Sequence, residues 1–280
     1  MDTVKSSKKE VNLKIRKVDF KYKEIPRFYY ENNPFSTHFV NALHLLFPDG
    51  ERFFIDSMLR YMQEIDDPKL KRDVKMFCGQ EGIHGVEHEK IVKILNEKGY
   101  DTKPFLNAVK QTLKWADKIG TKAAGKSGPL ILTVCLEHFT ALFAEGMLQN
   151  IDTDKADPQI VELFLWHAAE ELEHKCVAYD LLQAVDDSEY NKRVVLMPIV
   201  SFLLYAFIGA GTVYFLAQDR EHLEVKKLPK QLNSFVFKFL RQFHSSGVAK
   251  WLDFFKKDFH PNQHDNYHLA EAFLEGKKYA

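Results

Sequence analysis

The sequence predicts an all-α fold in which four long helices surround a shared interior. The clearest helix is the stretch from Glu162 to Gln183, which contains no Gly or Pro. Other stretches of helical length begin at Pro or end at Gly, and several carry a carboxylate near the middle. The run from Val194 to Ala217, 24 residues without a charge, also suits a helix.

The stretch from Glu162 to Gln183 brings His167, Glu171 and His174 to positions i, i+4 and i+7. A helix places these side chains on one stripe, and apolar neighbours such as Leu163 indicate that the stripe faces an interior. Burying imidazole and carboxylate groups without a partner is costly. A bound metal ion suits all three, since such ligands favour iron, manganese or zinc.

The first third of the chain begins with an expected extended arm, residues 1–33, in which apolar and basic residues alternate. We expect two helices next, Pro34 to Phe47 and Glu51 to Ile65, separated by a stop at Pro48-Asp49-Gly50. Glu51 then lies in a first turn. Pro68 opens a long helix to about Asn96, whose three glycines lower its intrinsic stability by about 1 kcal/mol each. Close packing against a neighbour or a substrate channel would explain them.

The middle of the chain predicts a short amphipathic helix from Lys103 to Lys118 and a polar loop from Gly120 to Gly128. Pro129 to Gln149 is then a strongly apolar helix with Glu137 near its middle. Residues 152–157 form a linker before the helix that Pro158 opens. Four long helices therefore each bring a carboxylate.

The last third divides at Val194. The uncharged run to Ala217 is long enough to span a bilayer, and a core helix of a large all-α domain is the equal alternative. From Lys226 to Phe259, lysines interleave with aromatic residues, as in an interfacial helix pair or in a basic cap on the bundle. We expect an arm (1–33), a helical metal domain (34–189), a hydrophobic helix (190–218) and a basic amphipathic tail (219–280).

Charge and cysteine content bear on partners and compartment. The 39 basic and 39 acidic residues balance, which argues against a nucleic-acid partner. Three cysteines without Cys-x-x-Cys spacing indicate reduced thiols, and the polar, charged start of the chain predicts no secretory signal. We expect a cytoplasmic protein that associates with membranes through 194–217 and the tail.

The metal ligands are predicted from two Glu-x-x-His units on separate helices, each preceded by a helix that supplies one more Glu. A carboxylate-bridged two-metal site inside a four-helix bundle needs this set. The alternatives are that Glu51 responds to the helix dipole and that His167 is an outer donor. We expect His88 to be an outer donor or a surface residue, and Glu170 and Glu173 to be solvated or salt-bridged. The predicted ligands are Glu51, Glu81, His84, Glu137, His167, Glu171 and His174.

These residues resemble the ligand set of the ferritin-like di-iron carboxylate superfamily. The motif His167-x-x-x-Glu171-x-x-His174 is similar to that of p-aminobenzoate N-oxygenase-type enzymes, in which the extra histidine is a third nitrogen ligand. Asn33-Pro-Phe35, Gly50-Glu-Arg-Phe53 and Gln80-Glu-Gly-Ile-His84 make the wider chain, from Pro26 to Phe255, look like the bacterial family labelled predicted metal-dependent hydrolase.

The resemblance implies a ferritin-like bundle with two iron ions, or manganese, that activates O2 as co-substrate to oxidise a small molecule. The apolar segment after Arg193 and the aromatic tail favour an apolar or aromatic substrate. Such chemistry needs an electron donor of the ferredoxin or flavin reductase type. A membrane surface and a second copy of the chain are further candidate partners. The competing functions are a hydrolase, in which the metal pair activates water, and a ferritin-like ferroxidase without an organic substrate.

Overall fold

The computed structural model describes residues 11–150, 153–244, 247–275 and 277, so parts of the predicted arm, linker and tail lie outside the described residues. The described residues contain α-helices and short 3-10 turns but no strand, which confirms the all-α class. The ferritin-like bundle and the four-part division of the chain stay predictions. The helices are α1 (Pro34–Leu59), α2 (Pro68–Glu97), α3 (Lys103–Ala124), α4 (Gly128–Asn150), α5 (Pro158–His174), α6 (Val177–Val185), α7 (Glu189–Gln218), α8 (Leu228–His244), α9 (Gly247–Asp253) and α10 (Tyr267–Glu275).

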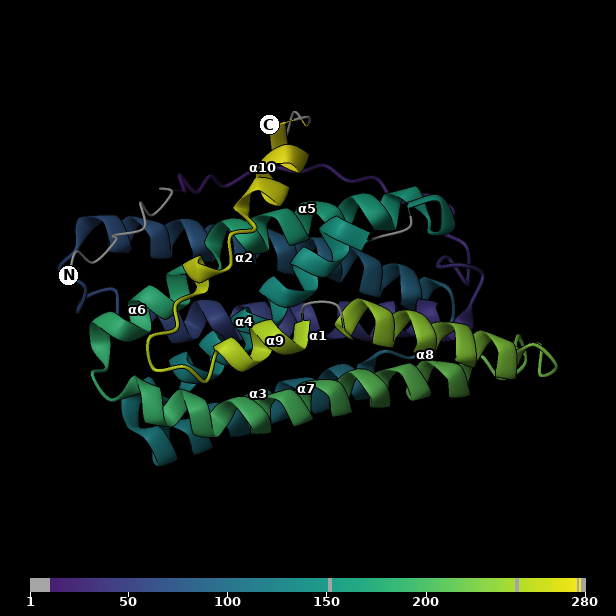
Figure 1. The fold of residues 1–280 in the computed structure, drawn as a ribbon. Helices are drawn as coiled ribbons and strands as arrows, with labels where there is room; N and C mark the ends of the chain where they lie inside the picture. The colour runs from purple at the N-terminus through teal and green to yellow at the C-terminus, as the bar shows by residue number, and fades with distance from the viewer. Residues whose placement is uncertain (1–10, 151–152, 245–246, 276, 278–280) are drawn as a thin grey trace.

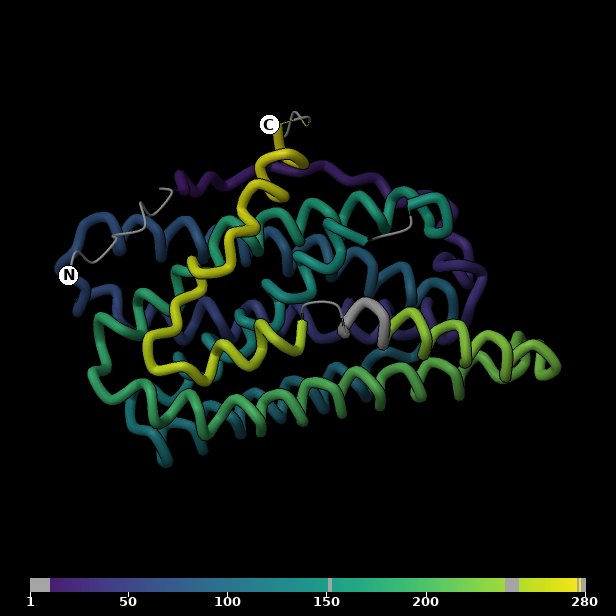
Figure 2. The backbone as a smooth tube through the Cα atoms, in the orientation of Figure 1, coloured from purple at the N-terminus to yellow at the C-terminus, as the bar shows by residue number. Residues whose placement is uncertain are grey.

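The centre of the molecule lies between α1, α2, α4 and α5 (Figure 1). The helix α1 packs along α2, and α4 packs along α5, while contacts of α1 with α4 and of α2 with α5 close the ring. On one side α3 and α7 cover α1 and α4, and on the other α10 lies across α5, as Figure 2 shows. The core includes fully buried side chains from all four central helices, such as Leu45, Phe77, Leu130 and Leu163.

Three of these helices begin at a capping residue followed by Pro. The side chains of Asn33, Asp67 and Asp157 accept hydrogen bonds from the backbone N–H groups at the starts of α1, α2 and α5. Such caps satisfy donors that have no partner inside the helix, and the Pro at the first helical position loses no bond there. The predicted starts of these helices are therefore confirmed.

The predicted stop at Pro48-Asp49-Gly50 is wrong, because α1 continues through Pro48 to Leu59. A Pro inside a helix costs about 3 kcal/mol. Apolar side chains on both sides of it, including Leu45 and Phe54, are buried in the core and outweigh that cost. Glu51 consequently lies inside a long helix and not in a first turn, so the helix dipole does not account for it.

The predicted single helix from Glu162 to Gln183 is interrupted at Lys175 and Cys176, directly after His174. The Lys175 side chain is 7% exposed, and its ammonium group donates to Asn266 Oδ1 and to the backbone oxygen of His264. A buried ammonium group needs such acceptors, and the turn lets this one reach them.

The predicted loop from Gly120 is also wrong in part, since α3 continues to Ala124. The backbones of α3 and α4 approach each other closely where they join. A Cβ atom on Gly128 would lie 2.1 Å from the Gly120 oxygen. Only glycine fits at this position, so the two glycines mark a helix contact where the sequence indicated a loop.

The uncharged segment forms most of α7, which packs on α1 and α4 through buried residues such as Met197 and Phe215. Its most apolar window is only 22% buried, so α7 is not an enclosed core helix. The described residues hold two helical stretches that are long and apolar enough to cross a membrane by length and composition, Lys103–Asn150 and Glu189–Gln218. That is weak support for membrane association.

Candidate metal centre

The seven predicted ligands converge in one buried cluster at the centre of the helical ring. Each of them is at most 3% exposed. They come from α1 (Glu51), α2 (Glu81 and His84), α4 (Glu137) and α5 (His167, Glu171 and His174). The helical spacings therefore turn all seven side chains toward one point.

One group of donors surrounds His174. Its Nε2 atom lies 3.0 Å from Glu81 Oε1, 3.5 Å from Glu171 Oε2 and 3.6 Å from Glu137 Oε2. One donor atom from each of these four residues lies within 4.8 Å of the others. Three carboxylates and one imidazole at this separation form a cage that a single metal ion would fit.

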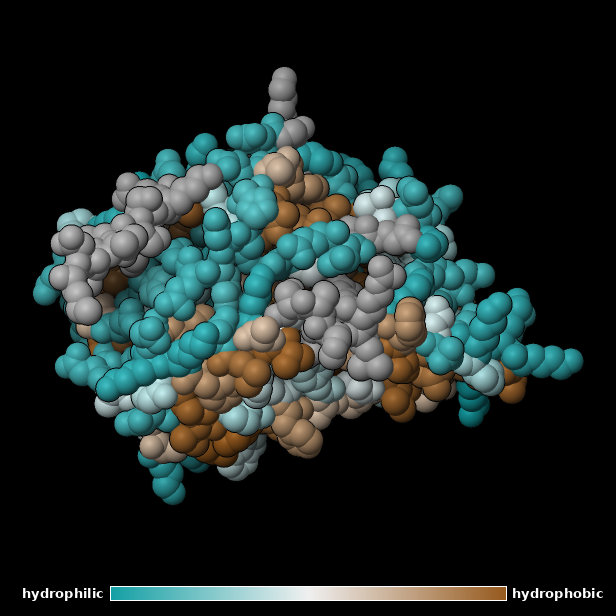
Figure 3. All heavy atoms as spheres, in the orientation of Figure 1, coloured by the Kyte–Doolittle hydropathy of each residue, from teal (hydrophilic) through white to brown (hydrophobic). Residues whose placement is uncertain are grey.

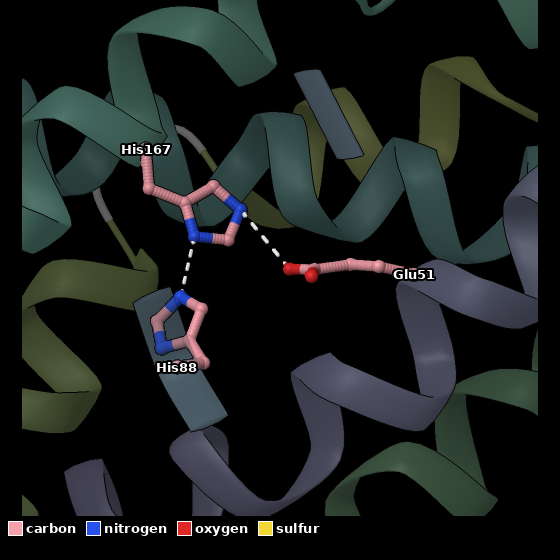
Figure 4. A group of neighbouring side chains, drawn as sticks. All are labelled: Glu51, His88 and His167. Carbon is pink, nitrogen blue, oxygen red and sulfur yellow. Dashed lines mark hydrogen bonds and ion pairs between the residues drawn. The ribbon is translucent and has the colours of Figure 1, made fainter. Parts of the chain in front are cut away.

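A second group lies beside the first. His84 Nδ1 is 3.7 Å from Glu81 Oε1 and 3.8 Å from Glu171 Oε1. His167 Nε2 is 2.8 Å from Glu171 Oε1 and 3.7 Å from Glu51 Oε1, and Figure 4 shows His167 between Glu51 and His88. Glu81 and Glu171 belong to both groups, which is where carboxylates that bridge two ions would stand.

Most of the candidate ligand atoms of the centre lack a hydrogen-bond partner, the exception being the contact of His167 Nε2 with Glu171 Oε1. Both oxygens of Glu51, Glu81 and Glu137 are buried without a hydrogen bond, as are Glu171 Oε2, His84 Nδ1 and His174 Nε2. The short contact between His174 and Glu81 lacks hydrogen-bond geometry. Unsatisfied buried carboxylates are among the most costly groups in a protein. A pair of divalent cations would satisfy these atoms together, so the residues fit a dinuclear site.

The protonation equilibria of the cluster reflect the same crowding. Burial and neighbouring carboxylates raise the pKa values of Glu51 and Glu137 well above the ordinary value. Burial opposes protonation of His84, but the carboxylates of Glu170 and Glu81 raise its pKa to about 9. The metal-free cluster therefore holds protons that binding of cations would displace.

Each histidine of the cluster is held from behind by a second side chain. His174 Nδ1 lies 3.1 Å from Gln80 Oε1, and His84 Nε2 lies 3.0 Å from Glu170 Oε2. His167 Nδ1 lies 2.7 Å from His88 Nε2. These contacts occupy one nitrogen of each ring and leave the other to face the centre, the usual arrangement behind metal-bound histidines.

The N-terminal arm reaches this outer layer through Arg16. Its guanidinium donates to Glu170 Oε1 at 2.9 Å and to both oxygens of Glu173 at 2.5 and 2.8 Å. The sequence predicted that Glu170 and Glu173 are solvated or salt-bridged, and they are salt-bridged while buried. The arm, to which the sequence assigned no chemistry, thus supports the partner of His84.

The sequence analysis gave no role to His44, and it expected His88 to be either an outer hydrogen-bond partner of a ligand or a surface residue. Both are buried, and their Nδ1 atoms lie 2.7 Å apart, which makes a row of three imidazoles with His167. His88 also lies within ligand range of Glu51 and His167. His44 lies seven residues before Glu51, so the two side chains share a face if one helix contains both. The predicted helix ended before Pro48, and this spacing therefore could not be used.

An apolar cavity reaches Glu51 from the side covered by α3 and α7. It offers about 160 Å³ to water-sized molecules and is lined by residues of α1, α3, α4 and α7. Among the described lining residues Glu51 alone is charged, and the walls include Phe53, Val109 and Phe207. The cavity gives an apolar molecule a place beside the centre.

The sequence of the chain matches one protein-family model. A model described as predicted metal-dependent hydrolase matches residues 14–265, which is most of the chain. No curated protein and no solved structure matches the chain. The description agrees with the buried histidine and carboxylate groups in implying dependence on a metal. The chain thus belongs to the family of predicted metal-dependent hydrolases.

Proposed function

We propose that the protein is an enzyme with a dinuclear metal centre held by the seven clustered residues. The observation that carries this proposal is the convergence of buried ligand atoms, most of which have no hydrogen-bond partner. In this arrangement His174 and Glu137 would hold one ion, while His84, His167 and Glu51 would hold the other. Glu81 and Glu171 lie within ligand range of residues on both sides and would contribute to holding both ions.

For the chemistry we propose O2-dependent oxidation of an apolar or aromatic substrate with two irons, or manganese, as the metals. Mixed carboxylate and imidazole ligands suit these metals, and four ionised carboxylates balance the charge of two divalent ions. When bound, the irons would supply electrons to O2, and a ferredoxin or flavin reductase would restore them. The cavity supports this choice, because its aromatic and aliphatic walls suit an apolar substrate and it reaches Glu51.

Hydrolysis is the second candidate, and the family description favours it. In a hydrolase the metal pair would lower the pKa of a bound water. A hydrolase also needs groups that hold an ester or phosphate and protonate the leaving group. Beside Glu51, the described lining residues with polar side chains are Thr112 and Thr140, which favours an apolar substrate over an ionic one.

The test is to purify the chain without oxygen, load it with iron or with zinc, and measure metal content, O2 uptake after reduction and turnover of p-nitrophenyl esters. We expect about two irons per chain and O2 uptake. The variant Glu137→Gln should lose most of one metal equivalent. Glu145→Gln is the matched control, because Glu145 is another buried glutamate of α4 and pairs with Lys250 and Asn266 outside the centre.

The outcomes separate the candidate functions. Ester turnover with zinc or manganese, and no response to O2, would establish the hydrolase. Uptake of O2 with release of ferric iron, and no oxidised organic product, would establish a ferroxidase. Failure to bind any of these metals would overturn all three functions.

A further inference from the structure

The outer face of α7 is apolar over nearly its whole length. Its exposed side chains recur at helical spacing and include Val195, Ile199, Phe202 and Val213, which are 66%, 51%, 72% and 64% exposed. No charged residue interrupts the stripe between 194 and 217. A helix that packs inward and still shows an unbroken apolar stripe outward has a second partner on that side.

The neighbouring helix α3 adds basic and aromatic side chains to this face. Trp115 and Ile119 are 60% and 57% exposed, and Lys114 and Lys118 stand exposed beside them. The two helices touch through the rings of Phe105 and Phe207, whose centroids are 6.1 Å apart. Lysines interleaved with exposed aromatic and aliphatic residues are typical of helices that lie in a lipid interface.

The other flank of α7 is formed by α8 and α9. The rings of Tyr205 and Phe239 join α8 to α7, and Trp251 Nε1 donates to Ser201 Oγ at 3.1 Å and joins α9 to it. Leu252 is 54% exposed there. Figure 3 shows hydrophobic atoms gathered on the lower part of the molecule, over α7 and α9.

The apolar cavity opens on the same face. Leu203 of α7 is 43% exposed in the stripe and also lines the cavity, whose inner end is at Glu51. The cavity is also lined by Thr112 and Ala116 of α3, the helix that carries the lysines. The entrance to the centre thus lies between the two helices that carry the exposed apolar and basic side chains.

We propose that the face formed by α3, α7 and α9 docks on an anionic lipid bilayer, so that an apolar chain passes from the bilayer past Leu203 into the cavity. Because α7 packs on α1 and α4 by its inner side, it lies along the bilayer and does not cross it. A second copy of the chain would bring lysines of like charge together, whereas anionic headgroups attract them. The proposed docking depends only on the exposed residues of this face, whereas the proposed delivery of substrate also rests on the proposed function.

The docking is tested by flotation of the metal-loaded protein with vesicles of phosphatidylcholine, with and without phosphatidylglycerol. The double variant Ile199→Ser, Phe202→Ser should bind vesicles about tenfold more weakly or worse. Val86→Ser is the matched control, because Val86 is 51% exposed on α2. Lys114→Glu with Lys118→Glu should remove the preference for phosphatidylglycerol, and Lys75→Glu on α2 should not.

Contact with the bilayer is measured through Trp115. Phosphatidylcholine with brominated acyl chains should quench part of the tryptophan fluorescence, and Trp115→Phe should lower that quenching. Equal flotation of the α7 variants and the wild type, or quenching of equal size in the wild type and in Trp115→Phe, would overturn the docking. A dimer in sedimentation that Phe202→Ser breaks, without any flotation, would show that a second copy covers the face.

Delivery of substrate is measured separately, with the fluorescent fatty acid cis-parinaric acid. The wild type should bind it, and Leu203→Trp should bind it at least about fivefold more weakly while floating as before. Absence of binding by the wild type would overturn delivery and leave docking intact. Loss of metal by the wild type under these conditions would instead count against the proposed function.

Discussion

The two glycines that precede and follow His84 provide a paired test of the metal centre. A Cβ atom on Gly82 would meet nothing within 4 Å, whereas a Cβ atom on Gly85 would lie 3.0 Å from Glu51 Oε2. Replacing glycine by alanine inside a helix stabilises it by about 1 kcal/mol. Gly82→Ala should therefore raise the melting temperature by about 2 °C, with or without metal.

Gly85→Ala should have different effects on the metal-free and the metal-bound protein. In the metal-free protein the Glu51 side chain shifts by a few tenths of an ångström, and the variant should be as stable as Gly82→Ala. Metal-ligand distances tolerate only about 0.2 Å. With metal bound, the same shift should weaken binding of one ion by about tenfold, or about 1.4 kcal/mol.

The assay is an anaerobic metal titration of both variants, together with thermal unfolding with and without a chelator. Equal metal affinity of the two variants would refute the reasoning, because Glu51 would then not be held by an ion. A loss of stability in metal-free Gly85→Ala would show that Glu51 is fixed by packing alone.

Three further predictions concern the outer layer and the protons. His88→Ala should lower metal affinity by about 10- to 100-fold in an equilibrium titration, because His88 holds the outer nitrogen of His167, and an unchanged affinity would assign His88 to packing alone. Arg16→Ala should destabilise the protein by about 3 kcal/mol in urea unfolding, because it leaves a buried carboxylate pair without its cation, and a change below about 1 kcal/mol would contradict that account. Folding raises the pKa of Glu51 above 4.5 and that of His84 from 6.5 to about 9, so the stability that these groups contribute is present below those ordinary values and is lost as the pH rises. The urea midpoint of the metal-free protein should accordingly fall between about pH 5 and pH 9, and a midpoint that declines equally in the metal-loaded protein would contradict the assignment of the protons.

The sequence predicts which candidate ligands share a helix face, because helical periodicity is a local property. Residues three, four and seven apart share a face, so the placement of His167, Glu171 and His174 follows once the segment is a helix. The all-α class follows in the same way from long stretches that begin at capping residues and Pro. Neither inference needs knowledge of what packs against the helix.

What the sequence leaves out depends on contacts between distant segments. Burial on both sides keeps α1 helical through Pro48, and this places His44 behind the centre. The turn after His174 allows the Lys175 ammonium group to donate to Asn266 and to the backbone oxygen of His264, which lie far along the chain. The exposed side of α7 could not be told from a buried one, because composition does not say which face has a neighbour.

The salt bridges of Arg16 also constrain the order in which the centre is completed. Arg16 is 157 residues before Glu173 in the chain, so its contacts close a loop that contains the four ligand-bearing helices. During synthesis the arm emerges first, and Arg16 has no carboxylate partner until Glu170 and Glu173 of α5 have followed it. The salt bridges of Arg16 therefore form only after the ligand-bearing helices have been synthesised, and we expect Glu170, the outer partner of His84, to be fixed late in folding.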